Sequence, residues 1–574
     1  MTGDDRTSAR AGVAGRAAPG VFAAAGLIAV VTLAARVFGF GRWLVFSQSV
    51  GTTCVGTVYQ AANQLPNVVF EVAAGGALAA VVVPIIAGQL ARQNEDEAAR
   101  TASAMLTWTL ALLVPLSILM AACARQLSTF LVDDTRCAGS TSLMASMLVI
   151  FSPQIALYGV GIVLAGVLQA HRRFLGVVVA PLLSSLVVIA AYLLFAALAQ
   201  GRGNDLARLP SQASSALAVG TTLGVAALSL SLLIPVHRAG IRLRPTWTFP
   251  EGVARRASSL AGAGLLALVT QQVAVLVTLW VSQHRGGTGT LNVYIYVQAI
   301  YLLPYAVLAV PFAMSALPAL ATGLDQAVLA VGSDQAALAS GADRASLARA
   351  QSTLAASARA IVVATSAGAA VLFAIAGPTG AFFSAMDAGR YSSAGREALA
   401  ALPGALSAFA PGLVGFGMAA LLTRALYVQG RPAVAAGLVA LGWLIAAVVP
   451  LLVLQGDAGP ASTLLWLGLA SSFGMTVAAV GLFVAVRRSW GAKAFQGFSR
   501  SAVVALVAAA FSATVGRALA ALLRSDGLVG AAVVAVLVAS AVAALCALWI
   551  WIGDRGAARL ALARLPVLWR WRTR

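Results

Sequence analysis

Long apolar stretches recur along the whole chain and are separated by short segments that carry the charged residues. Most of these stretches hold about 20 residues or more, the length that an α-helix needs to cross the hydrocarbon core of a bilayer. The pattern predicts fourteen membrane-spanning helices. The expected spans are residues 21–47, 57–89, 103–124, 142–169, 175–199, 215–236, 257–282, 291–322, 354–377, 398–423, 432–454, 462–486, 502–522 and 528–552.

The composition agrees with this pattern. Of 574 residues, 60% are hydrophobic and only 10% are charged, and the mean hydropathy is +0.91. A soluble protein typically carries about 25% charged residues. A soluble enzyme, a fibrous protein and a disordered chain are therefore excluded, and the predicted fold class is an all-α polytopic membrane protein.

The net charge of +20 is spread unevenly over the loops. With the N-terminus in the cytoplasm, 26 of the 38 basic residues fall in cytoplasmic segments, nine on the opposite side and three inside predicted spans. Such a bias predicts an even number of spans with both termini cytoplasmic. We expect the basic tail, residues 554–574, to lie on anionic membrane lipids, and we expect no nucleic-acid partner.

Two proline motifs, Leu65-Pro66-Asn67 and Leu303-Pro304-Tyr305, open similar helices in the two halves of the chain. They favour a parallel repeat of two six-helix lobes followed by two further helices. Transporters that are built from repeats bind their substrate between the lobes. The expected divisions are a basic arm (1–20), an N-lobe (21–239), a C-lobe (240–490), helices 13 and 14 (491–553) and the tail (554–574).

The first predicted span contains two arginines, Arg36 and Arg42. An arginine at the centre of a spanning helix costs about 2.5–3.5 kcal/mol on insertion scales. The two are about 9 Å apart along a helix and cannot both lie at one edge of the core. A bend at Gly39 and Gly41 would bring both towards one cavity, where they would bind an anion. Snorkelling or ion pairing for stability is the alternative.

The second span carries a polar stripe. Asn63, Asn67 and Glu71 recur at every fourth position, so they lie on one helix face that must contact protein or water rather than lipid. Glu71 is placed to balance Arg36 or Arg42. For the two amides alone, a seam of hydrogen bonds between helices explains the pattern equally well.

The second half of the chain has a similar but uncharged arrangement. Gln271 lies on a polar face of the seventh span, and the eighth span carries Tyr294, Gln298, Tyr301 and Tyr305 on one face. Tyrosines often form belts at the membrane interface. Four polar side chains that extend about 16 Å along a helix favour the wall of an amphipathic cavity instead.

No constellation of catalytic or metal-binding residues is recognisable, so neither an enzyme, a cofactor nor a metal site is expected. Cys54, Cys123 and Cys137 all fall near one side of the predicted membrane, which leaves open a disulfide between two of them. Arg359, near the cytoplasmic end of the ninth span, is expected to snorkel.

Several motifs of the chain resemble one known family, the MurJ/MviN lipid II flippases of the multidrug/oligosaccharidyl-lipid/polysaccharide exporter superfamily, in the form found in actinobacteria. The resemblance covers essentially the whole chain in order. The matching segments are residues 35–42, Leu65-Pro66-Asn67, Gly75-Gly76-Ala77, Val83-Pro84, residues 166–174, residues 303–310 and residues 424–427.

The resemblance implies a flippase of the bacterial plasma membrane. It would move undecaprenyl-pyrophosphate-linked disaccharide-pentapeptide, lipid II, from the inner to the outer leaflet by alternating access, for peptidoglycan assembly. Arg36 and Arg42 match two family arginines that grip the pyrophosphate, and helices 13 and 14 would form a groove for the lipid tail. Cell-wall synthesis or division proteins are further partners that it implies.

This chain departs from the family pattern at several charged positions. Two positions that are acidic in the family hold Trp43 and Thr57 here. Three positions that are basic in the family hold Phe70, Glu71 and Ala299. The cavity would therefore be less cationic than is usual in the family.

Three other functions remain open. A cation-coupled drug or small-solute antiporter of the same fold needs buried carboxylates, and Glu71 is the sole candidate inside a span. An inactive scaffold paralogue would explain the missing charges. A lipid-linked glycosyltransferase needs acidic or metal-binding loop motifs, whereas the external loops carry only scattered aspartates.

Overall fold

The computed structural model describes residues 38–250, 253–314, 316, 320, 341–387, 395–523 and 527–564. Over these residues the chain is helical and contains no β-strand, and twelve helices are long and apolar enough to cross a membrane. These twelve correspond to the third to fourteenth predicted spans. The second span is a continuous helical segment over residues 54–91, and residues 38–49 form the described part of the first.

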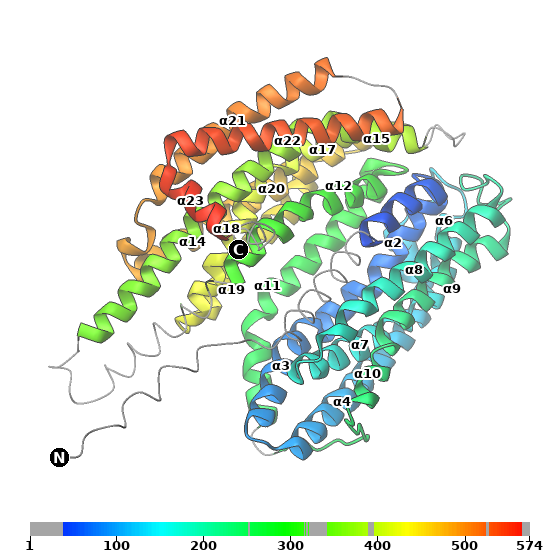
Figure 1. The fold of residues 1–574 in the computed structure, drawn as a ribbon. Coiled ribbons are helices and arrows are strands. Elements are labelled where there is room, and N and C mark those ends of the chain that lie inside the picture. Colours follow the sequence, from blue (N-terminus) through cyan, green and yellow to red (C-terminus); the bar gives the residue numbers. More distant parts are fainter. Residues whose placement is uncertain are drawn as a thin grey trace, which may run out of the picture.

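The first half of the chain, the N-lobe, forms one bundle, drawn from blue to green in Figure 1. After the helical residues 38–49, its elements are α2 (Cys54–Phe70), η1 (Glu71–Gly75), α3 (Gly76–Ala91), α4 (Glu95–Ala122), α5 (Ala124–Leu131), α6 (Ser140–Phe151), α7 (Gln154–Ala170), α8 (Phe174–Ala199), α9 (Ser211–Leu230) and α10 (Leu233–Arg238).

The second half, the C-lobe, forms the other bundle, and the last helices pack against it (Figure 1). The C-lobe consists of α11 (Val253–Val281), η2 (Ser282–Gly286), α12 (Thr290–Pro304), η3 (Tyr305–Ala309), α14 (Gly341–Ala374), α15 (Ala376–Asp387), α16 (Arg396–Ala400), α17 (Leu402–Phe409), α18 (Gly412–Val428), α19 (Pro432–Val453), α20 (Gly459–Trp490) and η5 (Ala492–Phe495). The appended helices are α21 (Phe498–Leu522), α22 (Leu528–Gly553) and α23 (Arg555–Arg564).

Corresponding helices of the two lobes are interrupted in the same way. The fourth spanning helix of each lobe is broken next to a proline, Pro153 between α6 and α7 and Pro411 between α17 and α18. The second spanning helix of each lobe contains a proline followed by a π-helical turn, η1 or η3. Proline removes a backbone donor, and π turns absorb the resulting irregularity. These shared breaks support the predicted repeat.

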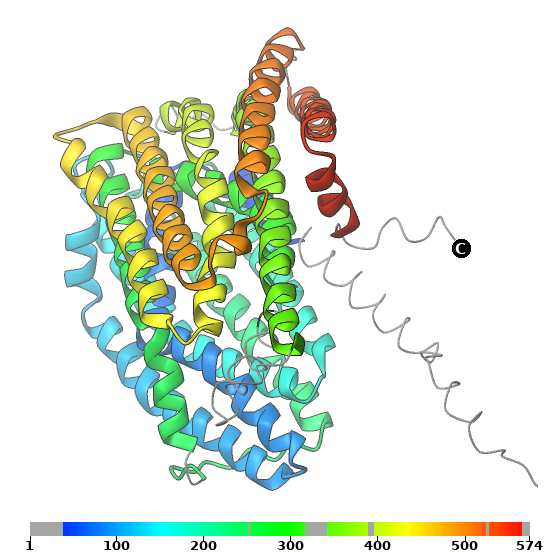
Figure 2. The same ribbon diagram turned by 90° about the vertical axis from the view of Figure 1, so that its left-hand side faces the viewer.

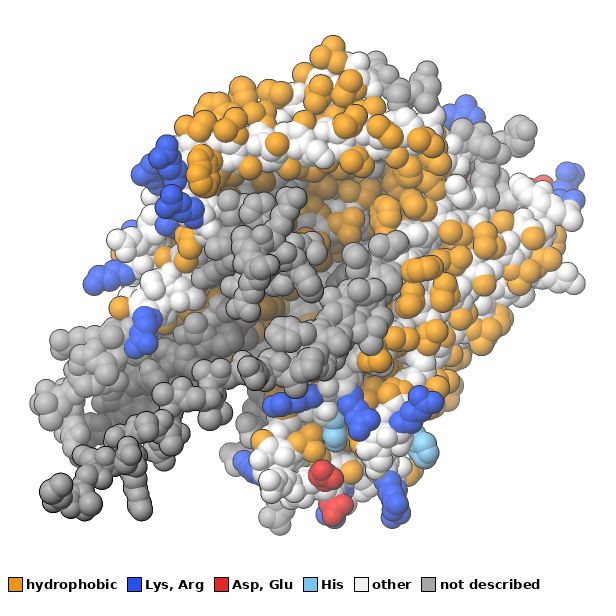
Figure 3. Space-filling model, in the orientation of Figure 1, with side chains coloured by type: hydrophobic (Ala, Val, Ile, Leu, Met, Phe, Trp, Pro, Cys, Tyr) orange, Lys and Arg blue, Asp and Glu red, His pale blue; other side chains and the backbone are white. Residues whose placement is uncertain are grey.

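Large apolar side chains cover the outer faces of the bundles. Leu193 on α8, Leu452 on α19 and Val529 on α22 are each more than half exposed. In water such a surface would promote aggregation, but in a bilayer it contacts lipid. Figure 3 shows this apolar surface, with many of the basic side chains gathered near the helix ends.

A buried ion pair attaches the appended helices to the C-lobe. Arg359 of α14 donates from Nη2 to both carboxylate oxygens of Asp554 at 3.0 Å, and its Nε donates to Ser501 Oγ at 2.8 Å. Asp554 also accepts from the backbone N–H of Ala557 at 2.9 Å. The expectation that Arg359 snorkels is therefore wrong, because a carboxylate almost 200 residues away along the sequence reaches it.

We predict that Asp554→Ala lowers the stability of the protein in detergent by about 2–3 kcal/mol, since it leaves Arg359 partly buried without its partner. Thermal unfolding measures the change. The matched control is Asp205→Ala, which removes an exposed partner of Arg208 and should have almost no effect. Equal losses in both variants would contradict the anchoring role.

The same carboxylate predicts a pH dependence. Burial raises the pKa of Asp554, but hydrogen bonds from Ser501, Ala557 and Arg359 outweigh this and hold it below its ordinary value of 3.8. The contribution of the pair is therefore complete at neutral pH and is lost as the pH falls below about 4.

Candidate functional site

The polar stripe of the second span lies on α2 and η1. Asn63, Asn67 and Glu71 are all half-buried, and the Asn63 Oδ1 atom is buried without a hydrogen-bond partner. Glu71 begins the π-helical turn, and its carboxylate folds back over Gly75, where a Cβ would overlap it. Gly75 thus leaves the space that this carboxylate occupies. π turns often occur at functional sites.

Arg42 lies in the helical segment 38–49 and is half-buried. Its guanidinium carbon is 5.4 Å from the centre of the Trp43 ring, and its Nε is buried without a hydrogen-bond partner. The hydroxyls of Tyr59, Tyr158 and Tyr192 lie close enough to interact electrostatically with its charge. The part of the chain that the structure describes contains no carboxylate oxygen within 4.0 Å of the Arg42 guanidinium.

We expected the charge of Glu71 to balance that of an arginine. Among the described residues Glu71 forms no ion pair with Arg42. The other candidate for this balance, Arg36, lies outside them. The cationic guanidinium of Arg42 is left with aromatic neighbours and an unpaired donor, which is suited to an anionic ligand.

The polar residues of the C-lobe gather around α12. Gln298 is half-buried and its Nε2 donates to Tyr294 Oη at 3.0 Å. Tyr301 is only 4% exposed, and its ring centre is 5.7 Å from that of Phe409 in α17. Gln271 of α11 is half-buried. Gln298 and Tyr301 therefore share one helix, whereas Arg42 lies among the tyrosines of the N-lobe.

Hydrogen bonds between the lobes close one end of the molecule. Asn292 Nδ2 of α12 donates to the Gly51 carbonyl at 2.7 Å. The Gly289 N–H donates to Thr57 Oγ1 at 2.9 Å, and Gln283 Nε2 donates to the Thr57 carbonyl at 3.3 Å. We call this set of contacts the outer latch. At the opposite end α14 lies well apart from α3 in Figure 1, whereas α11 of the C-lobe packs against α3.

Glycines allow the close approach at the outer latch. A Cβ on Gly56 would lie 2.8 Å from Asn292 Nδ2, and Gly289 adopts a φ of +82° beside Thr52. This contact was not predicted from the sequence. The run Gly286-Gly287-Thr288-Gly289 in the loop before α12 was the one signal that could have indicated it.

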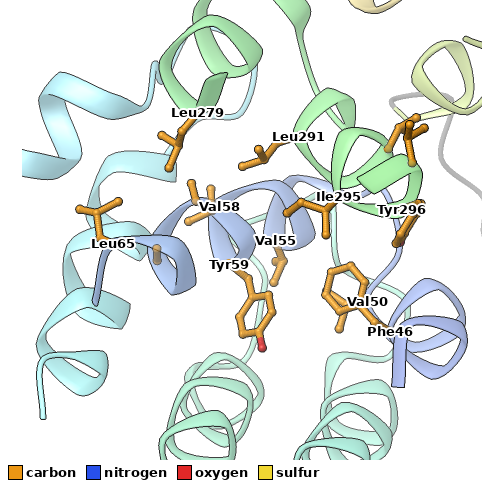
Figure 4. Packing of buried hydrophobic residues seen from close by; sticks show 14 of the residues in the cluster. Phe46, Val50, Val55, Val58, Tyr59, Leu65, Leu279, Leu291, Ile295 and Tyr296 are labelled. Atoms are coloured by element: carbon orange, nitrogen blue, oxygen red, sulfur yellow. The ribbon is translucent and has the colours of Figure 1, made fainter. Parts of the chain in front are cut away.

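Aromatic rings extend the closure inward from the outer latch. The ring centre of Phe46 is 5.7 Å from that of Tyr59 in the N-lobe and 6.3 Å from that of Tyr296 in the C-lobe. Tyr296 in turn stacks on Phe383 of α15 at 4.8 Å. Figure 4 shows Phe46 between residues of α2 and α12. The two lobes thus share one apolar core at this end.

A disulfide joins Cys54, at the start of α2, to Cys137, before α6, and Cys123 is free. Of the pairings left open by the sequence, the structure therefore contains one. The neighbouring Arg136 forms an ion pair with Asp457 of the C-lobe. The disulfide thus connects α2 to a loop that itself contacts the opposite lobe.

Two helical lobes with polar inward residues and an apolar outer surface define a multi-pass membrane transporter. The model of the family described as "Lipid II flippase MurJ" matches residues 46–538, so the chain belongs to this family.

The chain is 27% identical over 287 residues to a probable lipid II flippase MurJ of Rhizobium meliloti (strain 1021). The aligned part covers 48% of this chain and 50% of that protein. The corresponding protein of Rhizobium tropici is 26% identical over 280 residues, with the same coverage. The chain thus spans about half the length of these relatives.

Solved structures show the same fold. A lipid II flippase MurJ in an inward closed conformation superposes with a TM-score of 0.67 at 15% identity, covering 92% of this chain and 99% of that chain. An inward-facing multidrug resistance transporter of the MATE family gives a TM-score of 0.60 at 14% identity, covering 81% and 98%. At these identities the likeness establishes the fold alone.

We predict that Asn292→Ala opens the outer latch, because the Gly51 carbonyl loses its donor. Spin labels at Ser142→Cys and Ser462→Cys, on the outer ends of α6 and α20, report the separation once Cys123 and Cys546 are replaced by Ser. Pulsed electron paramagnetic resonance should then show a population with a longer distance between the two labels than in the parent protein.

The matched control is Asn204→Ala. Asn204 Oδ1 accepts from the Cys54 N–H inside the N-lobe, so its loss should leave the distance between the lobes unchanged. An Asn292→Ala distribution identical to that of the parent would show that the hydrogen bond does not hold the lobes together.

Proposed function

We propose that this protein carries lipid II from the cytoplasmic to the outer leaflet of a bacterial plasma membrane by alternating access. The observation that carries the proposal is Arg42, a cation held inside a spanning helix without a carboxylate partner among the described residues, in a chain of the lipid II flippase family. A pyrophosphate headgroup favours charge-assisted, bidentate contacts, which arginine provides.

The proposed binding residues extend from Arg42 across both lobes. Arg36 is the proposed second cation. Asn63 and Asn67 offer amide groups to the sugar or peptide part of the headgroup, and Glu71 accepts hydrogen bonds from it. Gln271 and Gln298 are proposed to contact the headgroup from the C-lobe, where Tyr301 supports the wall through its contact with Phe409.

The outer latch suggests the order of events. With the latch closed, substrate enters from the opposite end, where α14 lies apart from α3, and release requires Asn292 and Thr57 to lose their bonds across the interface. The arginine distribution supports placing both termini and this opposite end in the cytoplasm. Residues 1–20, 21–239, 240–490, 491–553 and 554–574 are the proposed units, and no enzymatic step is proposed.

The proposed partners besides lipid II are anionic membrane lipids and cell-wall synthesis or division proteins. The basic tail, residues 554–574, is proposed to contact the lipids.

We predict that Arg42→Ala abolishes growth when this protein replaces the lipid II flippase of a depleted strain, while the amount of protein in the membrane stays the same. Arg42→Lys keeps the charge but loses the planar fork, so it should restore growth only partly. Arg100→Ala, on an exposed position of α4, is the control and should complement fully. Full complementation by Arg42→Ala would refute the headgroup contact.

A cation-coupled antiporter is the second candidate, favoured by the similarity to the MATE transporter and by the half-buried carboxylate of Glu71. It predicts that Glu71→Gln abolishes ion-driven efflux of a cationic dye from vesicles. The flippase proposal predicts no such efflux in the parent protein and partial loss of complementation in Glu71→Gln. Dye efflux that requires Glu71, without binding of lipid II, would favour the antiporter.

A further inference from the structure

An elongated apolar groove of about 680 Å³ lies between α20 and α21. The two helices follow one another in sequence but pack on different neighbours, α20 on α18 and α19, and α21 on α14 and α22. Figure 2 shows them on the same face of the C-lobe, joined at one end by the segment that contains η5. Residues of α14 and α18 line the floor. The residues that line the groove come from none of α2, η1, α12 and α22, so it is separate from the region of Arg42.

The groove opens sideways to the bilayer. Val480 and Leu506, on its two rims, are 58% and 52% exposed. Three of its lining residues carry hydroxyl groups. Thr476 and Thr514 are bonded within their own helices, to Ser472 O at 2.7 Å and to Phe511 O at 2.8 Å, and the Ser366 Oγ atom is buried without a hydrogen-bond partner. The walls therefore suit an alkyl chain rather than a polar ligand.

The length of the groove fits a chain from one leaflet. From Ala502 to Thr514 it follows α21 for about 18 Å at the rise of an α-helix. Half of the hydrocarbon core of a bilayer is about 15 Å thick. One acyl chain that enters at Ala502 would thus reach slightly beyond the bilayer centre.

The end of the groove near η5 is strongly basic. From the last turn of α20 to the first turn of α21, residues 487–500 contain four exposed cations and no acidic residue. These are Arg487, Arg488, Lys493 and Arg500, of which Arg500 donates to the Gly553 carbonyl of α22 at 2.9 Å. Phe483 and Phe498 line the same end, with their ring centres 5.3 Å apart. An anionic headgroup beside these cations would place its chain past the two rings and into the groove.

We infer that this groove binds one acyl chain of an anionic phospholipid of the cytoplasmic leaflet, with its phosphate beside Arg487, Arg488 and Lys493. The lipid fills the space between the C-lobe and α21 and so stabilises the attachment of the appended helices. The leaflet follows from the proposed orientation, but the binding does not depend on transport of lipid II. A failure of the transport assay would therefore leave this inference standing.

Native mass spectrometry of the delipidated full chain tests the inference by titration with dioleoyl phosphatidylglycerol or dioleoyl phosphatidylcholine. One phosphatidylglycerol should bind at lower concentration than phosphatidylcholine. Ala502→Trp fills the groove and should abolish this binding. The matched control is Val503→Trp, since the neighbouring Val503 is 62% exposed and does not line the groove.

A second variant keeps the apolar interior intact. Replacing Arg487, Arg488 and Lys493 by Gln should weaken phosphatidylglycerol binding about tenfold and leave phosphatidylcholine binding unchanged. The control replaces Arg238, Arg242 and Arg244, exposed cations near α10, by Gln and should have no effect.

Three results would overturn the inference. They are equal binding of the two phospholipids, phosphatidylglycerol binding that survives both the Ala502→Trp and the triple Gln change, and displacement of the bound phosphatidylglycerol by an equimolar amount of undecaprenyl phosphate. The last result would assign the groove to the polyprenyl chain of the substrate.

Discussion

Water is absent from the hydrocarbon core of a membrane, so each polar group there must find a partner within the protein or face an enclosed space. This constraint organises the molecule. Asn292 and Thr57 bond across the lobe interface at the outer latch, and Arg359 finds Asp554 at the opposite end. Several neutral side chains of the described residues also have a buried atom without a partner, but Arg42 Nε is the one such atom that belongs to a charged group. We assign this charged group to the substrate.

The two ends of the lobes differ in a way that suits alternating access. At the outer latch, glycines bring the backbones into contact, and Phe46 and Tyr296 continue the closure inward. At the other end α14 lies apart from α3, and α11 is the C-lobe helix that contacts α3. The outer latch, the ring contacts and the Arg136–Asp457 ion pair join side chains of separate helices, so opening this end requires no helix to unfold.

The spans and the lobe pattern could be predicted from the sequence because hydropathy, arginine distribution and proline positions act locally along each helix. Arg42 and the stripe from Asn63 to Glu71 were found for the same reason, since charge inside a span is conspicuous. The outer latch and the Arg359–Asp554 pair were missed because their partners are far apart in sequence. No local pattern specifies which distant helix will supply a partner.

The most direct test of the account is translocation of fluorescent lipid II by the purified protein in liposomes, with a membrane-impermeant reagent that quenches only the outer leaflet. The account predicts that fluorescent lipid II from the inner leaflet is also quenched when the protein is present. Labelled phosphatidylcholine in the inner leaflet should stay protected. Lipid II that stays as protected as in protein-free liposomes, with the protein folded and inserted, would contradict it.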